Sequence, residues 1–321
     1  MGGFFGVASA AADASGELFY GTDYHSHLGT MRGGLAVWQD GRITRIIHDI
    51  TNAPFRTKFE PERPRLHGPV GIGVISDTDD QPLLIRSRLG TYALVTVGAA
   101  QNGAELQREA FGRGVHFSET RGEEVPLTEL VAMLINQGRD LVDGIRRVHD
   151  QLRGSCSLLL LMDGAIIAAR DRWGRTPVIL GRREDAWAVT METCAFPNLE
   201  FETARELGPG EVVRIAPEGV ETLVAPSGTP EGRIYHVQDV HRAGGIHTIL
   251  GQLWWDRPQL VHADVLTVTG ETMLKNLEKW SLRSKKLCAP AKRLYRDGWQ
   301  ATGRSVEQVK AMYRGAKPAK L

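Results

Sequence analysis

The chain alternates between two hydrophobic patterns, and each predicts a different kind of element. Over residues 2–9 glycines alternate with apolar side chains, which is typical of a buried strand that neighbouring backbone approaches closely. Asp40-Gly41 and Asp163-Gly164 each separate two apolar runs, so each predicts a two-residue β-hairpin turn. Over residues 128–152 apolar positions recur every three or four residues on either side of Gly138, which predicts two amphipathic helices.

The remaining segments predict more strands with short connections. The expected strands are 71–76, 91–97, 178–180, 187–190, 212–215 and 220–224. Residues 11–20 predict a short helix ending at Gly21, residues 101–103 a turn, and residues 52–68 a Pro- and Arg-rich loop long enough to cover a site. Strands followed by a helix pair and then strands again predict an α+β fold.

A composition change divides the chain. Residues 225–232 (APSGTPEG) have the composition of a linker. We therefore predict a domain over 1–226, a linker over 227–237, a small partly helical extension over 238–280 and a basic tail over 281–321. In the extension, residues 246–255 predict a helix. For the tail, weak helices and disorder are equal alternatives.

The composition favours a globular protein and gives no sign of a membrane span. A hydrophobic share of 42% with 24% charged residues is ordinary for a globular protein, and no apolar run reaches the length of a membrane span. Three widely separated cysteines, Cys156, Cys194 and Cys288, favour reduced thiols and a cytoplasmic location.

The net charge of +1 hides an asymmetry. From Lys275 onward there are thirteen Lys and Arg against three acids, a balance of +10, so the preceding residues carry −9. A basic tail is compatible with nucleic-acid binding. A solvated end is the favoured interpretation, so we do not expect nucleic acid as a partner.

Histidine pairs are the candidate metal ligands. On a strand, two histidines spaced as His25 and His27 are would point the same way, but no further ligands are spaced for zinc, so a satisfied core or loop pair is favoured. His236, His241 and His247 fit no common metal spacing either. We expect neither a metal nor a cofactor.

Four ordered motifs point to a known family. They are Gly2 to Val7 (GGFFGV), Ala169 to Pro177 (ARDRWGRTP), Glu192 to Ala195 (ETCA) and Leu207 to Val213 (LGPGEVV). Together they resemble the class II glutamine amidotransferase domain of the amidophosphoribosyltransferases, over residues 1 to about 226. The resemblance implies a four-layer αββα sandwich of the N-terminal-nucleophile hydrolase type. It also implies the purine-synthesis lineage, whose members release ammonia from glutamine with a Cys thiolate.

Carried over position by position, that resemblance implies an altered site. The nucleophile position is Gly2, which has no side chain to attack an amide carbon. The Arg that grips the glutamine carboxylate is replaced by Ser76, and the Asp that holds the amine is replaced by Leu127. The oxyanion donors correspond to Asn102 and Gly103, although a hairpin turn explains this pair equally well. No catalytic residue is therefore intact.

Other polar residues have structural explanations. Arg170 and Asp171 are better explained by turn and inter-strand pairing than by catalysis. Asp79-Asp80 has the character of a solvated loop. No segment after residue 226 has the strand and acidic pair that bind phosphoribosyl pyrophosphate.

The extension resembles a second family. Residues 239–246 (DVHRAGGI) and 264–272 (DVLTVTGET) are similar to an internal stretch of the dihydroxy-acid and sugar-acid dehydratases. The similarity covers only about residues 238–277, without the cluster-binding cysteines, so it implies no dehydration chemistry.

Three functional hypotheses follow. The first is an amidophosphoribosyltransferase-like protein with a degenerate glutaminase site and no phosphoribosyltransferase domain. The second is a non-catalytic module that binds a small molecule or a protein partner in the former glutamine cleft. The third is a basic-tailed nucleic-acid binder.

Overall fold

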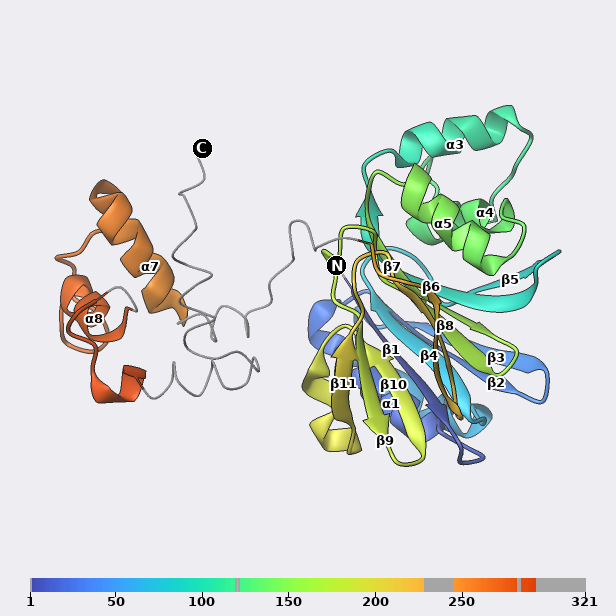
Figure 1. The fold of residues 1–321 in the computed structure, drawn as a ribbon, viewed down its shortest axis with the longest axis horizontal. Coiled ribbons are helices and arrows are strands. Elements are labelled where there is room, and N and C mark those ends of the chain that lie inside the picture. Colours follow the sequence, from blue (N-terminus) through green and yellow to red (C-terminus); the bar gives the residue numbers. More distant parts are fainter. Residues whose placement is uncertain (1, 119, 121, 228–244, 282–283, 293–321) are drawn as a thin grey trace. The chain divides into compact units, whose positions relative to one another are not determined.

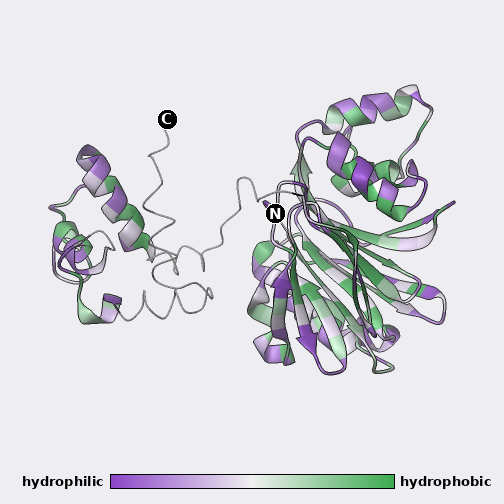
Figure 2. Ribbon diagram, viewed as in Figure 1, coloured by the Kyte–Doolittle hydropathy of each residue, from purple (hydrophilic) through white to green (hydrophobic). Residues whose placement is uncertain are grey.

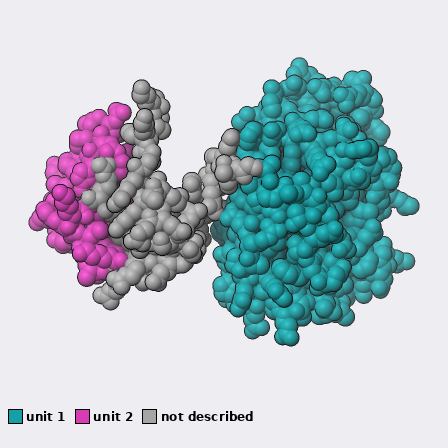
Figure 3. Space-filling view, in the orientation of Figure 1, with its two compact units in different colours: residues 1–234 teal, residues 235–321 magenta. Residues whose placement is uncertain are grey.

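The computed structural model describes residues 2–118, 120, 122–227, 245–281 and 284–292. The chain divides into two compact units, Met1–Ile234 and Tyr235–Leu321 (Figure 3). Residues 228–237 of the predicted linker and most of the predicted basic tail lie outside the described residues, so the boundaries of both segments stay predictions.

The first unit contains two antiparallel sheets (Figure 1). The seven-stranded sheet A has the order β11 (Glu202–Glu206), β9 (Ile179–Arg183), β10 (Ala186–Thr190), β1 (Gly2–Ser9), β4 (Val70–Ser76), β2 (Arg32–Gln39) and β3 (Arg42–Asp49). The six-stranded sheet B has the order β13 (Gly219–Val224), β12 (Val212–Ala216), β8 (Ala165–Ala169), β7 (Gly154–Met162), β6 (Gly90–Ala100) and β5 (Leu83–Ser87). The strand at 2–9 and both Asp-Gly hairpins are confirmed.

Three apolar clusters stack these elements into four layers. The first lies between the sheets and includes Phe4, Val95 and Leu159. The second joins sheet A to α1 (Ser15–Asp23) and α2 (Phe55–Phe59). The third joins sheet B to α3 (Gly103–Gly112), α4 (Leu127–Asn136) and α5 (Leu141–Gln151). Figure 2 shows the apolar strand segments inside the unit. The predicted αββα sandwich is confirmed.

Three connections differ from the sequence prediction. Residues 101 and 102 form the predicted turn but not a hairpin, because β6 ends at Ala100 and α3 begins at Gly103. Residues 52–68 are not an open loop: they form α2 and a 3₁₀ helix, η2 (Glu60–Arg65), and bury Phe55 and Phe59. The helix predicted over 11–20 begins at Ser15 and continues past Gly21 to Asp23.

Helices α4 and α5 have the predicted amphipathic pattern, and α5 has a side-chain cap at its N-terminus. The Asp140 carboxylate accepts a hydrogen bond from the backbone N–H of Asp143 at 2.8 Å. A capping side chain satisfies an N–H that the helix itself leaves unpaired.

Asp140→Ala is therefore expected to lower the free energy of unfolding by about 1 kcal/mol. Urea denaturation measures this loss. Asp150→Ala, at an exposed position near the other end of α5, is the matched control. An equal loss in both variants would contradict the capping role.

The second unit is small and partly helical in its described residues. It contains α7 (Gly245–Asp256), a 3₁₀ helix, η5 (Pro258–Leu260), and α8 (Met273–Trp280). The Asn276 side-chain amide donates to the hydroxyls of Thr267 (2.7 Å) and Thr269 (2.8 Å), which fixes the loop before α8. Within the part of the chain that the structure describes, no helix is long and apolar enough to cross a bilayer.

Candidate functional site

Two of the positions implicated by the family motifs meet at one end of sheet A. Gly2, the first residue of β1, pairs with Ser76, the last residue of β4. Ser76 also pairs with Arg32 at the start of β2. The order of the strands therefore brings the nucleophile position beside the position of the carboxylate clamp, a pairing that the sequence analysis did not predict.

Gly2 is buried, and its surroundings leave no room for a side chain. A Cβ atom built on Gly2 would lie 2.6 Å from the carbonyl oxygen of Ile75, which belongs to the backbone of the paired strand β4. Non-bonded carbon and oxygen atoms do not approach this closely without a backbone shift. On the neighbouring residue, a Cβ of Gly3 would meet Leu28 at 2.5 Å and His25 at 2.9 Å.

The Ser76 hydroxyl organises the turn that follows β4. It accepts hydrogen bonds from the backbone N–H groups of Thr78 (3.1 Å) and Asp79 (3.3 Å). A serine that bonds the backbone two and three residues ahead stabilises a tight turn. At the position that the resemblance aligns with the family's guanidinium, this chain has a neutral, buried hydroxyl that binds its own backbone.

Asp79 extends from this turn to the start of α4. Its carboxylate accepts hydrogen bonds from the backbone N–H of Thr128 at 3.3 Å and from the Thr128 hydroxyl. Thr128 in turn lies 2.7 Å from the hydroxyl of Thr96 on β6. Because the N-terminal end of a helix carries partial positive charge, this carboxylate caps α4 from outside the helix.

The prediction of a solvated acidic pair is therefore wrong for Asp79, which is only 8% exposed. It holds for Asp80, which is exposed and pairs with Arg32 at 2.8 Å. Leu127, at the position of the amine clamp, is the first residue of α4 and packs against the apolar cluster on sheet B. An apolar side chain provides no charge for a substrate amine.

Asn102 and Gly103 form the start of α3. The Asn102 side-chain N–H donates to the carbonyl of Gln151 at 2.9 Å, and its carbonyl accepts from the N–H of Arg153 at 2.8 Å. Both ends of the amide therefore bind the connection between α5 and β7. The hairpin explanation of this pair is wrong, and the amide N–H expected as an oxyanion donor is already used within the protein.

Arg170 and Asp171 have the structural role that the sequence favoured. Arg170 is 2% exposed, and its guanidinium donates to the carbonyls of Thr176 (3.0 Å), Gly174 (2.6 Å) and Leu207. The Asp171 carboxylate accepts from the backbone N–H groups of Trp173 (3.0 Å) and Thr176 (2.9 Å). The two side chains thus hold the turn after β8.

The two histidines make separate protein contacts. His25 is fully buried; its Nδ1–H donates to the carbonyl of Gly21 at 2.8 Å, and the Thr190 hydroxyl lies 2.8 Å from Nε2. Burial lowers the pKa of His25 to about 4. His27 Nε2 lies 2.7 Å from the carboxylate of Glu192. Sequence reasoning named neither Thr190 nor Glu192 as a partner of these histidines.

The thiol of Cys194 is not an activated nucleophile. The Cys194 thiol donates to the carbonyl of Tyr24 at 3.5 Å, and burial raises its pKa. A raised pKa leaves the thiol protonated at neutral pH, whereas thiolate is the attacking form. Among the described residues no group of three His, Cys, Asp or Glu side chains is arranged to hold a metal ion.

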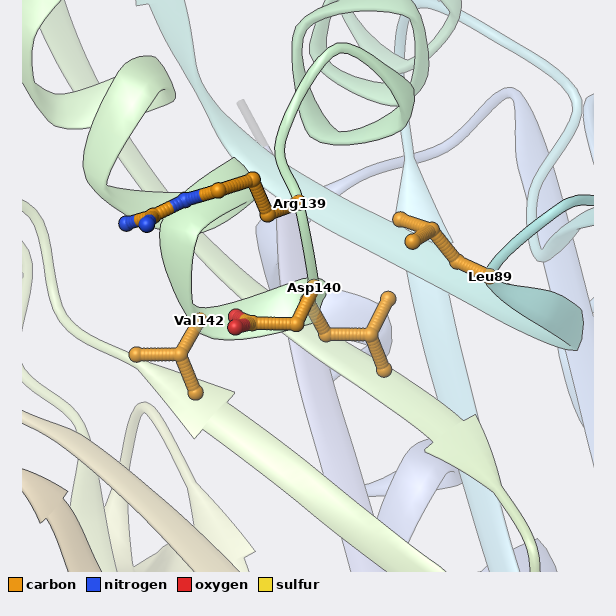
Figure 4. A pocket seen from close by; sticks show the side chains of 5 residues that line it. Leu89, Arg139, Asp140 and Val142 are labelled. Carbon is orange, nitrogen blue, oxygen red and sulfur yellow. The ribbon is translucent and has the colours of Figure 1, made fainter.

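A surface hollow of about 340 Å³ lies away from these positions. Leu89, Arg139, Asp140, Leu141 and Val142 line it, between the β5–β6 turn and the start of α5 (Figure 4). The Asp140 carboxylate there is already used as the helix cap. None of the motif positions lines this hollow.

Sequence comparison identifies the domain family of the central part of unit 1. Residues 67–198 match the family model described as a glutamine amidotransferase domain. This segment belongs to that domain family. The chain is 31% identical over 226 residues to the amidophosphoribosyltransferase of Methanocaldococcus jannaschii, a match that covers 67% of this chain and 47% of the relative. It is 32% identical over 145 residues to the Bacillus subtilis enzyme of the same name, covering 44% and 29%.

Solved structures support the same fold. The phosphoribosylpyrophosphate amidotransferase of B. subtilis matches with a TM-score of 0.65 at 23% identity, over 79% of this chain and 58% of that one. A structure described as the allosteric regulatory enzyme of purine biosynthesis matches with a TM-score of 0.68 at 21% identity, over 92% and 70%. The amidotransferase domain therefore has the N-terminal-nucleophile hydrolase fold. The chain spans about half the length of the curated relatives it matches, and the resemblance of the extension to dehydratases stays a prediction.

Proposed function

We propose that this amidotransferase domain, of the amidophosphoribosyltransferase lineage of purine biosynthesis, has a degenerate glutaminase site and does not hydrolyse glutamine. The observation that carries the proposal is the closure of the nucleophile position. Gly2 has no attacking atom, and the Ile75 carbonyl lies where the first side-chain carbon would have to be. Covalent attack on an amide needs a nucleophile held beside a base.

Three further observations support the proposal. Ser76 and Leu127 supply no charge for the carboxylate and the amine of glutamine. Asp79 places a buried carboxylate on the N–H of Thr128, so the start of α4 is already neutralised by the protein. The Asn102 amide N–H bonds Gln151. The nucleophile and both charged clamps are therefore absent, and one N–H of the Asn102 amide is used within the fold.

The purified chain is expected to release glutamate from glutamine no faster than buffer. Gly2→Cys, with Met1 removed, is expected to stay equally inactive and to lose about 1–3 kcal/mol of unfolding free energy through the clash with Ile75. A coupled glutamate assay and urea denaturation measure the two effects.

Gly16→Cys is the matched control, because a Cβ on Gly16 of α1 meets nothing within 4 Å. This variant is expected to keep the stability of the parent or to gain slightly from the loss of a helical glycine. Glutamate release by the parent chain would overturn the proposal. Activity in Gly2→Cys without loss of stability would show that the position is open.

The remaining role that we propose is binding, of a small molecule or a protein partner, at the former glutamine site. The domain keeps its fold and its buried hydrogen bonds at this end of sheet A although the reactive groups have changed. Three unpaired thiols, Cys156, Cys194 and Cys288, support a cytoplasmic location.

A thermal-shift screen tests the binding role, because any ligand specific for the folded state raises the melting temperature. Amino acids, nucleotides and phosphorylated sugars form the first panel. A hit that is lost in Ser76→Val, but not in the exposed control Ser118→Val, would assign it to this site. Binding of nucleic acid with a steep salt dependence would instead favour the basic-tail hypothesis.

A further inference from the structure

A second polar cluster lies between α5 and sheet B. His149 on α5, Cys156 on β7, and Asp171 and Arg172 after β8 line one small cavity, together with the apolar side chains of Val148 and Leu152. The space for solvent within it is about 10 Å³. A single water molecule needs about that volume, and larger ligands do not fit.

One atom of this cluster has no protein partner. His149 Nε2 is buried and makes no hydrogen bond. Two of the other described side-chain atoms that are buried without a hydrogen bond still lie near a carboxylate. Arg147 Nε is 3.5 Å from that of Asp143, and His48 Nε2 is 3.9 Å from that of Glu62. His149 is the one whose residue lines this cavity. Buried polar atoms are nearly always paired with protein or with ordered water.

The chemistry of the ring defines what the cavity accepts. Burial lowers the pKa of His149 and outweighs the attraction of Asp171, so the imidazole is neutral at neutral pH. A neutral imidazole carries one N–H, which we place on Nδ1. Nε2 is then a lone-pair acceptor and needs a donor. Asp171 and Arg172 line the cavity with opposite charges, so a neutral occupant is favoured over an ion.

We propose that one water molecule is a structural ligand of this cavity and donates a hydrogen bond to His149 Nε2. Its second proton goes to the Asp171 carboxylate, whose oxygens each accept one backbone N–H and retain a free lone pair. The water thereby joins α5 to the turn that Arg170 and Asp171 stabilise. Ordered water with two or more polar partners is costly to remove.

A high-resolution crystal structure of the full chain tests the site directly. The expected result is a density peak at about 2.7–3.2 Å from Nε2, present in the parent and in Cys156→Ala but lost in His149→Leu. His149→Leu is also expected to lower the melting temperature, whereas His116→Leu at an exposed position leaves it unchanged. An empty cavity, or a ring turned so that Nε2 contacts Cys156 or Asp171 directly, would overturn the proposal.

Nitrogen-15 NMR of the imidazole provides a test that needs no variant. The expected spectrum is that of a neutral ring protonated on Nδ1, with the Nε2 signal shifted as for a hydrogen-bonded acceptor. A cross-relaxation signal between water and the ring protons should accompany it. Protonation on Nε2, or an acceptor signal without a hydrogen bond, would contradict the assignment.

Discussion

Arg170→Met is expected to lower the free energy of unfolding by about 3–5 kcal/mol. The guanidinium is 2% exposed and donates to the carbonyls of Thr176, Gly174 and Leu207. It also pairs with the Glu206 carboxylate at 2.9 Å. Methionine fills part of the volume but leaves these acceptors without their donor, and each orphaned buried group has a desolvation cost. Urea denaturation followed by circular dichroism measures the loss.

Arg146→Met is the control for the loss of a positive charge. Arg146 is exposed on α5, and exposed substitutions usually change stability by less than about 0.5 kcal/mol. A loss below about 1 kcal/mol in Arg170→Met would mean that water replaces the guanidinium. The turn would then be held by Asp171 alone.

Short sequence patterns were sufficient to predict several turns, strands and helices of the fold. Asp40 and Gly41 have φ angles of 49° and 79°, and Asp163 and Gly164 have 48° and 68°. These are the left-handed conformations that the Asp-Gly turn signal predicts. The helix pair α4 and α5 followed from its three- and four-residue apolar period, because that pattern reports directly which face is buried.

Elements without a local apolar pattern were missed. Strand β11, with the sequence ETARE, is exposed along its whole length and forms through pairing with β9. Hydrogen-bond partners of side chains were missed for a related reason, because a partner can be far away in sequence. Asp79 appeared solvated because its partner, Thr128, is 49 residues away in sequence. The closure of the Gly2 position by the Ile75 carbonyl is likewise a property of strand register, which sequence spacing does not reveal.

For the motif positions too, local features could be predicted from the sequence, whereas contacts between distant residues could not. The sequence indicated that Gly2 and Ser76 lie at the ends of two strands, but it did not reveal that these two residues pair. It did not reveal that the Asn102 amide binds Gln151 and Arg153, since that contact depends on how α5 packs over sheet B. The residue types at the motif positions were therefore visible in the sequence, whereas the hydrogen bonds that these residues make required the structure.

Acidification is expected to destabilise unit 1 through His25. The ring is completely buried, and burial lowers its pKa from 6.5 to about 4. The unfolded chain therefore binds this proton more tightly than the folded protein does. The stability that His25 contributes is fully present above about pH 6.5 and is lost as the pH falls to about 4, a total of about 3 kcal/mol. Urea denaturation at a series of pH values measures the slope.

His25→Gln removes the titrating group, so its unfolding free energy should vary less between pH 6.5 and 4 than that of the parent. Its overall stability is expected to fall, because glutamine does not reproduce both hydrogen bonds to Gly21 and Thr190. His116→Gln, at an exposed position, should retain the parental slope. Carboxylates such as Asp49, whose pKa is lowered to about 2, titrate in all three proteins and cancel in the comparison. Equal slopes in the parent and His25→Gln would show that the buried ring exchanges its proton without unfolding cost.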